Sequence, residues 1–232
     1  VGSEMCIRDR TGLHTRLEDF LRNFDTIIDY ILDPTNQIEL FIIAGDLYKT
    51  RHPTNTQQEE FAKRLRRLQD HDVDTLILMG NHDIVVSEGA SHTAGVLRAL
   101  VADHIRVFDQ PGLYRKNDVG IVLMPYIYRQ KLGVKTNVEA LEFYKENTTS
   151  LLGDIRECTN KMFVGHQSVE GAKMPSGIAD PEKMSEIVVP ISYLQGFDFA
   201  VFGHIHEYQT MSKDPVSIYT GPLDRIDFSN AN

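Results

Sequence analysis

Residues 75–83 of the chain read TLILMGNHD, a largely apolar run followed at once by a glycine, an amide, an imidazole and a carboxylate. The run predicts a buried strand, and the polar residues predict a functional loop where it ends. Asn81 can offer a neutral carbonyl oxygen to a metal. His82 would point elsewhere, which suits proton donation or transition-state stabilisation. Asp83 is expected to accept a ring N–H of His82 and fix its tautomer. The alternative, a capped turn with an incidental histidine, requires four such residues to follow a strand by chance.

Three further apolar runs lead into short motifs that begin with glycine. They are residues 40–44 (LFIIA) before Gly45-Asp46, residues 161–164 (KMFV) before Gly165-His166, and residues 199–202 (FAVF) before Gly203-His204-Ile205-His206. In open α/β sheets, ligands bind at the carboxyl ends of the strands. We therefore expect these polar side chains to meet at one edge.

The residue types in these motifs favour a metal site. The Asp46 carboxylate has two oxygens and can bridge two cations, which two-metal sites hold roughly 3.5–4 Å apart. His204 and His206 are two residues apart and share a face if the backbone is extended. His166 alone would be weak, since a single histidine after a strand is often satisfied by hydrogen bonds. Oxygen and imidazole donors without a thiolate suit Mn, Fe or Zn and not a sulfur-bound structural zinc.

Length, charge and cysteine content narrow the class of protein. The chain has 232 residues, which fits one domain, and a net charge of -9, which argues against nucleic-acid binding by bulk charge alone. A nuclease stays open because bound metals attract phosphate directly. No apolar run approaches the roughly 18 residues that span a bilayer, so we expect a soluble protein with no membrane contact. Cys6 and Cys158 form no disulfide framework, which favours the cytoplasm.

The remaining pattern predicts a layered α/β sheet, because strands alternate with helices. Residues 1–10 fit neither periodicity and are interpreted as foreign sequence, leaving one domain over residues 11–232. The expected helices cover residues 13–32, a stretch capped by Thr54 or Thr56 and ending near Asp70, residues 94–101 and residues 137–158. Further strands are expected near residues 105–108, 119–124 and 216–219. Residues 171–190 are expected to form a long loop over the site.

The ordered motifs resemble those of the calcineurin-like metallophosphoesterase superfamily over nearly all of residues 11–232. Within it, residues 166–172 (HQSVEGA) and 219–228 (YTGPLDRIDF) resemble segments of SbcD-type nucleases. That group includes the nuclease subunit of the Mre/Rad double-strand-break repair complex and its phage counterparts. The resemblance implies a four-layered α/β/β/α sandwich with two divalent ions, usually Mn²⁺, with Fe²⁺ or Zn²⁺ as alternatives.

The resemblance also implies roles for the motif residues. Asp46 would bridge the two metals, while His206 would bind one of them. Asn81, His166 and His204 would bind the other. His82, with Asp83 beside it, would protonate the leaving oxygen or stabilise the charged phosphorane, while a metal-activated water attacks in line.

One family motif is absent. The family's first motif, Asp-x-His, should lie shortly before Thr11, where Asp9 is followed by Arg10. We therefore expect this chain to lack the first strand, to bind one metal well at the Asn81, His166 and His204 site, and to be nearly inactive. The C-terminal capping region and the segment that binds the ATPase partner are also expected to be missing.

The leading function is the catalytic domain of an SbcD-type DNA exo/endonuclease in repair or recombination. The resemblance implies DNA as substrate (duplex ends or single strands), an SMC-like ATPase subunit of the SbcC type as partner, a homodimer, and a cytoplasmic location, nucleoid-associated or phage-encoded. Two alternatives stay open. One is a metallophosphatase or small-molecule phosphodiesterase of the same superfamily, and the other is a non-catalytic scaffold or impaired fragment.

Overall fold

The computed structural model describes residues 13, 15–84, 95, 97, 103–174 and 186–224. The helices are α1 (Thr15–Leu32), α2 (Asn55–Gln69), α4 (Arg129–Leu132), α5 (Asn137–Asp154) and a 3-10 turn, η1 (Ile191–Leu194). The strands are β1 (Leu40–Ile43), β2 (Asp74–Leu78), β3 (Ile105–Phe108), β4 (Gly112–Lys116), β5 (Val119–Met124), β6 (Asn160–Gly165), β7 (Ser168–Val169), β8 (Val188–Val189), β9 (Phe199–Phe202), β10 (Gln209–Lys213) and β11 (Val216–Tyr219). No helix in the described part is long and apolar enough to cross a membrane.

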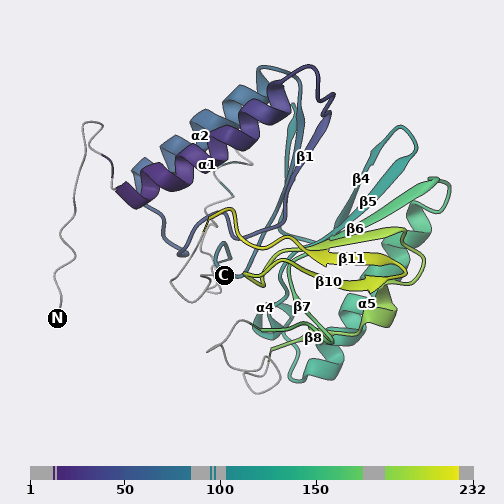
Figure 1. Cartoon of the computed structure of the whole chain (residues 1–232). Helices are drawn as coiled ribbons and strands as arrows, with labels where there is room; N and C mark the ends of the chain where they lie inside the picture. Colours follow the sequence, from purple (N-terminus) through teal and green to yellow (C-terminus); the bar gives the residue numbers. More distant parts are fainter. Residues whose placement is uncertain are drawn as a thin grey trace, which may run out of the picture.

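The strands form two main sheets that face each other. The smaller is parallel, in the order β1-β2-β3, and the larger has the order β10-β11-β9-β6-β5-β4. In the larger sheet β11, β9, β6 and β5 run parallel, and the two edge strands β10 and β4 are antiparallel to their neighbours. Figure 1 shows α1 and α2 outside the smaller sheet and α5 on the far side of the larger one. The predicted four-layered α/β/β/α sandwich is confirmed.

Side chains that alternate along β2 connect the first three layers, which are the helices α1 and α2, the smaller sheet and the larger sheet. Ile77 packs toward α1 and α2, where it joins Ile28 and Leu65 in one apolar cluster. Leu76 and Leu78 point the other way and meet side chains of the larger sheet. Because successive side chains of a strand point to opposite faces, a segment buried on both sides needs apolar residues on both faces, as residues 76–78 have.

The same alternation along β5 joins the last three layers. Ile121 and Leu123 belong to the cluster between the sheets. Val122 and Met124 belong to the cluster under α5, which contains the fully buried Tyr144. Each sheet is therefore covered on both faces, and its polar chemistry is confined to the strand ends.

Caps fix where two of the helices begin. Thr54 accepts the backbone N–H of Gln57, and the Gln57 side chain accepts the backbone N–H of Thr54, so Thr54 is the cap and not Thr56. Thr136 and Glu139 form the same reciprocal pair at the start of α5.

Several sequence expectations need correction or lie outside the described residues. The strands β4 and β10, at the edges of the larger sheet, were not expected. Within the stretch expected to be a loop, Val188–Val189 forms β8 and pairs with β7, while residues 175–185 lie outside the described part. Residues 1–10 also lie outside it, and of the helix expected at 94–101 only Gly95 and Leu97 are described, both helical.

Asp74 ties the two sheets together at the end opposite the motifs. Its Oδ2 atom accepts Tyr114 Oη at 2.7 Å and Lys116 Nζ at 3.0 Å, both from β4, and its Oδ1 atom lies 3.0 Å from His104 Nδ1. Burial alone would raise the pKa of Asp74, but the hydrogen bonds from Tyr114, Lys116 and His104 lower it to about 2. The ionised carboxylate therefore stabilises the contact between the sheets.

Replacing Asp74 by Asn is expected to lower the free energy of unfolding at pH 7 by about 1–2 kcal/mol. Because the pKa is lowered in the folded state, the stabilisation is present above the ordinary pKa of 3.8 and is lost as pH falls toward 2. Urea unfolding in EDTA at pH 7, 5, 4 and 3 measures this. A difference between the two proteins that stays constant across the series would contradict the assignment.

Candidate metal centre

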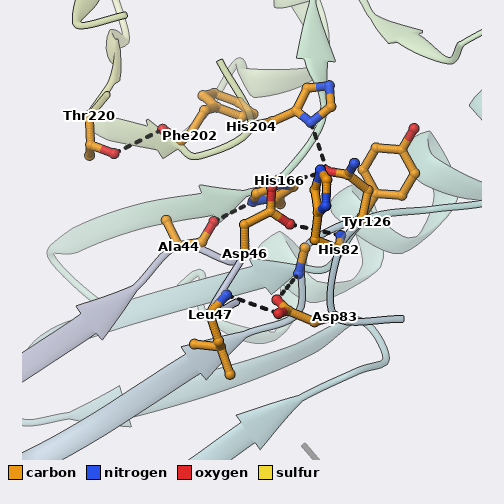
Figure 2. A network of polar contacts seen from close by, with 12 residues as sticks. Ala44, Asp46, Leu47, His82, Asp83, Tyr126, His166, Phe202, His204 and Thr220 are labelled. Atoms are coloured by element: carbon orange, nitrogen blue, oxygen red, sulfur yellow. Dashed lines mark hydrogen bonds and ion pairs between the residues drawn. The ribbon is translucent and has the colours of Figure 1, made fainter. Parts of the chain in front are cut away.

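The four predicted motifs meet at the carboxyl ends of strands from both sheets. The loops after β1 and β2 bring Asp46 and Asn81 from the smaller sheet, and those after β6 and β9 bring His166 and His204 from the larger one. Figure 2 shows Asp46, His166 and His204 gathered in one network. The expectation that these side chains meet at one edge therefore holds, with the edge shared between two sheets.

Close packing of the loops explains their glycines. A Cβ atom at Gly45 would lie 2.2 Å from Nδ1 of His166, and one at Gly80 would lie 2.1 Å from Oδ1 of Asp46. Both distances are far below van der Waals contact, so any side chain would push the loops apart. Asp46 and His204 themselves have positive φ angles of 55° and 86°. The turns after β1 and β9 thus place the Asp46 and His204 side chains toward the cluster.

His166 is fixed by the backbone of the first loop. Its Nδ1 atom lies 2.6 Å from the carbonyl oxygen of Ala44, which can only accept a hydrogen bond, so Nδ1 carries the proton. The Nε2 lone pair then faces Oδ1 of Asn81 at 3.2 Å and Oδ2 of Asp46 at 3.3 Å. Burial would lower the pKa of His166, but the Asp46 carboxylate raises it above its usual value. In the neutral form of the ring, Nε2 presents a lone pair toward the two oxygens.

His204 faces Asn81 with the other ring nitrogen, Nδ1, where His166 uses Nε2. Its Nε2 atom lies 2.7 Å from Oε1 of Glu186, and its Nδ1 atom lies 3.1 Å from Oδ1 of Asn81. The carboxylate accepts the Nε2 proton, which leaves the Nδ1 lone pair directed at the Asn81 oxygen. Two imidazole lone pairs thus converge on the same amide oxygen.

The converging donor atoms fit a divalent cation. Two ligands held at about 2.1 Å from one ion lie about 3.0–3.4 Å apart at tetrahedral to octahedral angles. The observed separations among Asp46, Asn81, His166 and His204 are 3.1–3.3 Å. Within the described residues, His, Cys, Asp and Glu side chains alone form no metal-binding group of three. The fit depends on the Asn81 amide oxygen, which lies next to both imidazole nitrogens and would be the third ligand atom.

The centre carries two carboxylates with opposite pKa shifts. Burial would raise the pKa of Asp46, but the charge and hydrogen bond of His166, with a smaller effect of His82, lower it to about 2. Burial and the nearby Asp46 charge raise the pKa of Asp83 to about 6. Asp46 therefore stays ionised at neutral pH, the state in which its charge attracts a cation.

His206 and His82 lie within electrostatic reach of the cluster. Burial lowers the pKa of His206, while the charge of Asp46 raises it and the charges of His204 and His82 lower it further. The backbone N–H of His82 donates to Oδ1 of Asp46 at 2.9 Å and so orients the carboxylate. The imidazole of His82 takes no part in this contact.

Asp83 has a different partner from the one expected. Its Oδ1 accepts the backbone N–H of Leu47 and its Oδ2 accepts that of Gly80, both at 2.9 Å, as Figure 2 shows for Leu47. The expectation that Asp83 fixes the tautomer of His82 is therefore wrong. The carboxylate instead joins the Asp46 loop to the Asn81 loop. Buried backbone N–H groups need an acceptor, which explains an acid at this position.

Sequence reasoning missed four side chains around the centre. Tyr126 and Tyr128 follow β5, and their position after a predicted strand was a signal that could have been used. Arg51 donates to Tyr128 Oη at 2.9 Å, and Tyr128 donates to the backbone oxygen of Asn81 at 2.7 Å. Glu186 lies in a stretch expected to be a loop, and nothing in the sequence marks it.

Comparison with known proteins identifies the family of the chain. The family model described as calcineurin-like phosphoesterase matches residues 13–208. The chain belongs to this family. The calcineurin-like phosphoesterase match includes Asp46, Asn81, His166, His204 and His206.

The proteins that resemble this calcineurin-like phosphoesterase include a DNA repair protein and a phosphatase. The DNA double-strand break repair protein Mre11 of Thermoplasma acidophilum is 25% identical over 213 residues, which are 91% of this chain and 52% of that protein. The chain thus spans about half the length of this relative. The crystal structure of a dimetal phosphatase from Danio rerio has a TM-score of 0.49 and 10% identity, covering 92% of this chain and 81% of that one.

Proposed function

We propose that the chain is the catalytic domain of a metal-dependent phosphodiester hydrolase that cleaves DNA, of the SbcD/Mre type. The observation that carries the proposal is the convergence of donor atoms from Asp46, Asn81, His166 and His204 at spacings of 3.1–3.3 Å. Family membership supports phosphoester hydrolysis. The likeness to an Mre11 protein and the two SbcD-like segments support DNA as the substrate.

In this proposal each side chain has a separate task. Asn81, His166 and His204 would hold one cation tightly, Asp46 would contribute to both sites, and His206 would hold a second cation more weakly. Bound divalent ions supply Lewis-acid polarisation of the phosphate and lower the pKa of water. His82 donates a proton to the leaving oxygen or stabilises charge on the phosphoryl group. Asp83 is a positioning residue that keeps the Asp46 and Asn81 loops together.

We propose Mn²⁺ as the metal, with Fe²⁺ and Zn²⁺ as the other ions that suit oxygen and imidazole donors. One tightly held cation per chain and slow turnover remain predictions for this sequence. The metal content of the purified protein tests the first. DNA as substrate, an SMC-like ATPase as partner, a homodimer and a cytoplasmic location belong to the same proposal.

The test is degradation of end-labelled linear duplex DNA by the purified chain with Mn²⁺, Fe²⁺ or Zn²⁺, compared with EDTA. We expect cleavage that needs the metal and that His82→Ala removes. A phosphate monoester and a small phosphodiester are assayed in parallel. Hydrolysis of these alone would identify a phosphatase or small-molecule phosphodiesterase. Because turnover is expected to be slow, the assays use the chain in excess over substrate, and a folded, metal-loaded chain that cleaves none of the three under these conditions would favour a non-catalytic scaffold.

A further inference from the structure

Glu186 reaches the centre from a segment that carries none of the motifs. It lies two residues before β8, and its Oε1 atom lies 2.7 Å from Nε2 of His204. The side chains of Glu186 and His204 are 12% and 13% exposed. This is a short, largely buried contact between a carboxylate and the ring nitrogen that faces away from Asn81.

Several contacts hold Glu186 in place. Tyr126 donates from its hydroxyl to Oε1 of Glu186 at 3.1 Å, and Asn137 at the start of α5 donates to the Glu186 backbone oxygen at 3.2 Å. The ring of Tyr126 also packs against that of His204, with centroids 5.4 Å apart. The carboxylate therefore has a fixed position relative to the imidazole and is no mobile surface charge.

The two histidines of the cluster are held by acceptors of different strength. His166 donates to a neutral backbone carbonyl, that of Ala44. His204 donates to a carboxylate, that of Glu186, whose Oε1 atom lies 2.7 Å from Nε2. A carboxylate on the far nitrogen makes an imidazole a more basic ligand than a carbonyl does. His204 is thus the more strongly polarised of the two.

We propose that Glu186 is a positioning residue that sets the tautomer and orientation of His204 and thereby the affinity of the centre for its cation. The inference rests on the proposed function, since it needs a centre that holds metal. Glu186 can only accept from Nε2, so the Nδ1 lone pair stays directed at Asn81 Oδ1, where the other donors converge. Residues 186–189, joined to β7 through β8, are then part of the metal centre.

Glu186→Gln is the sharpest test because the amide keeps the size of the side chain and can donate as well as accept. A donating amide allows the proton to move to Nδ1 of His204, which blocks that nitrogen as a ligand. We expect the dissociation constant for Mn²⁺ or Zn²⁺, measured by competition with a chelator, to rise about 10–100-fold. Glu170→Gln, at an exposed position after β7, is the matched control and should bind like wild type.

The tautomer itself gives a readout that needs neither metal nor activity. In EDTA at pH 8, long-range ¹H–¹⁵N correlation spectra should show His204 protonated at Nε2 in wild type and shared between the two nitrogens in Glu186→Gln. Should that variant not fold, Tyr126→Phe removes one donor to Glu186 and should weaken metal binding by a smaller factor. It keeps the ring contact with His204.

The outcomes separate this inference from the proposed function. A wild-type chain that binds no metal would overturn the proposed function, whatever the tautomer of His204. A wild-type chain that binds metal while Glu186→Gln and Tyr126→Phe bind it equally well, with the His204 tautomer unchanged, would overturn the role of Glu186 alone.

Discussion

Asp46→Asn is expected to weaken metal binding at least about 100-fold and to remove hydrolysis with it, because residues that merely support a ligand already contribute 10–100-fold. Asn is the right substitution because it keeps the shape of the side chain, an acceptor for the His82 N–H and tolerance of the positive φ of 55°. Only the charge and its second ligand oxygen are lost. Metal content of the dialysed protein and the rate of DNA cleavage are measured on the same preparation.

The control for Asp46→Asn is thermal unfolding in EDTA, which should stay a single cooperative transition. Its midpoint should fall by only about 2–8 °C relative to the metal-free wild type, because the folded state lowers the pKa of Asp46 as it does that of Asp74. Asp46→Ala is a poorer choice, since alanine at a left-handed φ costs about 1–2 kcal/mol by itself. An Asp46→Asn protein that retains its full metal content would show that the cation is held elsewhere.

His82→Ala is expected to lower the rate of cleavage by about 10²–10⁴-fold while leaving metal content unchanged. The contact that His82 makes with Asp46 comes from its backbone N–H, which alanine keeps. The imidazole is therefore removed without disturbing the carboxylate. Single-turnover cleavage with saturating Mn²⁺ measures the chemical step, and chelator competition measures the metal.

The matched control for His82→Ala is His71→Ala, at an exposed position just after α2, which should cleave like wild type. Loss of metal from the His82→Ala protein would reverse the assignment and make His82 a ligand. A rate equal to that of the His71 control would leave the proton donor unidentified and remove His82 from the mechanism.

The sequence predicted those parts of the fold that depend on burial from both sides. The apolar runs through β1, β2, β6 and β9 have no exposed face, so their strands and the loops after them could be located from hydrophobicity alone. The motif residues Asp46, Asn81, His166 and His204 were predicted for the same reason: each follows such a run. The family resemblance supplied the number of layers.

What the sequence did not predict depends on contacts between distant segments. The edge strands β4 and β10 are half-exposed and lack an uninterrupted apolar run. Asp83 follows the expected motif, but its partners are backbone N–H groups of two loops, which no side-chain pattern records. Glu186 lies 18 residues before His204 in a stretch without periodicity, so only its place in space reveals it.

The distribution of the donors between the two sheets has a consequence for the stability of the molecule. A cation bound by Asn81 of one sheet and by His166 and His204 of the other would cross-link segments of chain more than 80 residues apart. Binding would then be linked to the docking of the sheets, adding about 2.7 kcal/mol to global stability at a free metal concentration 100 times the dissociation constant. Loss of the metal would thus weaken the contact between the two sheets. The rate of proteolysis would then rise as the free metal concentration in the cell falls.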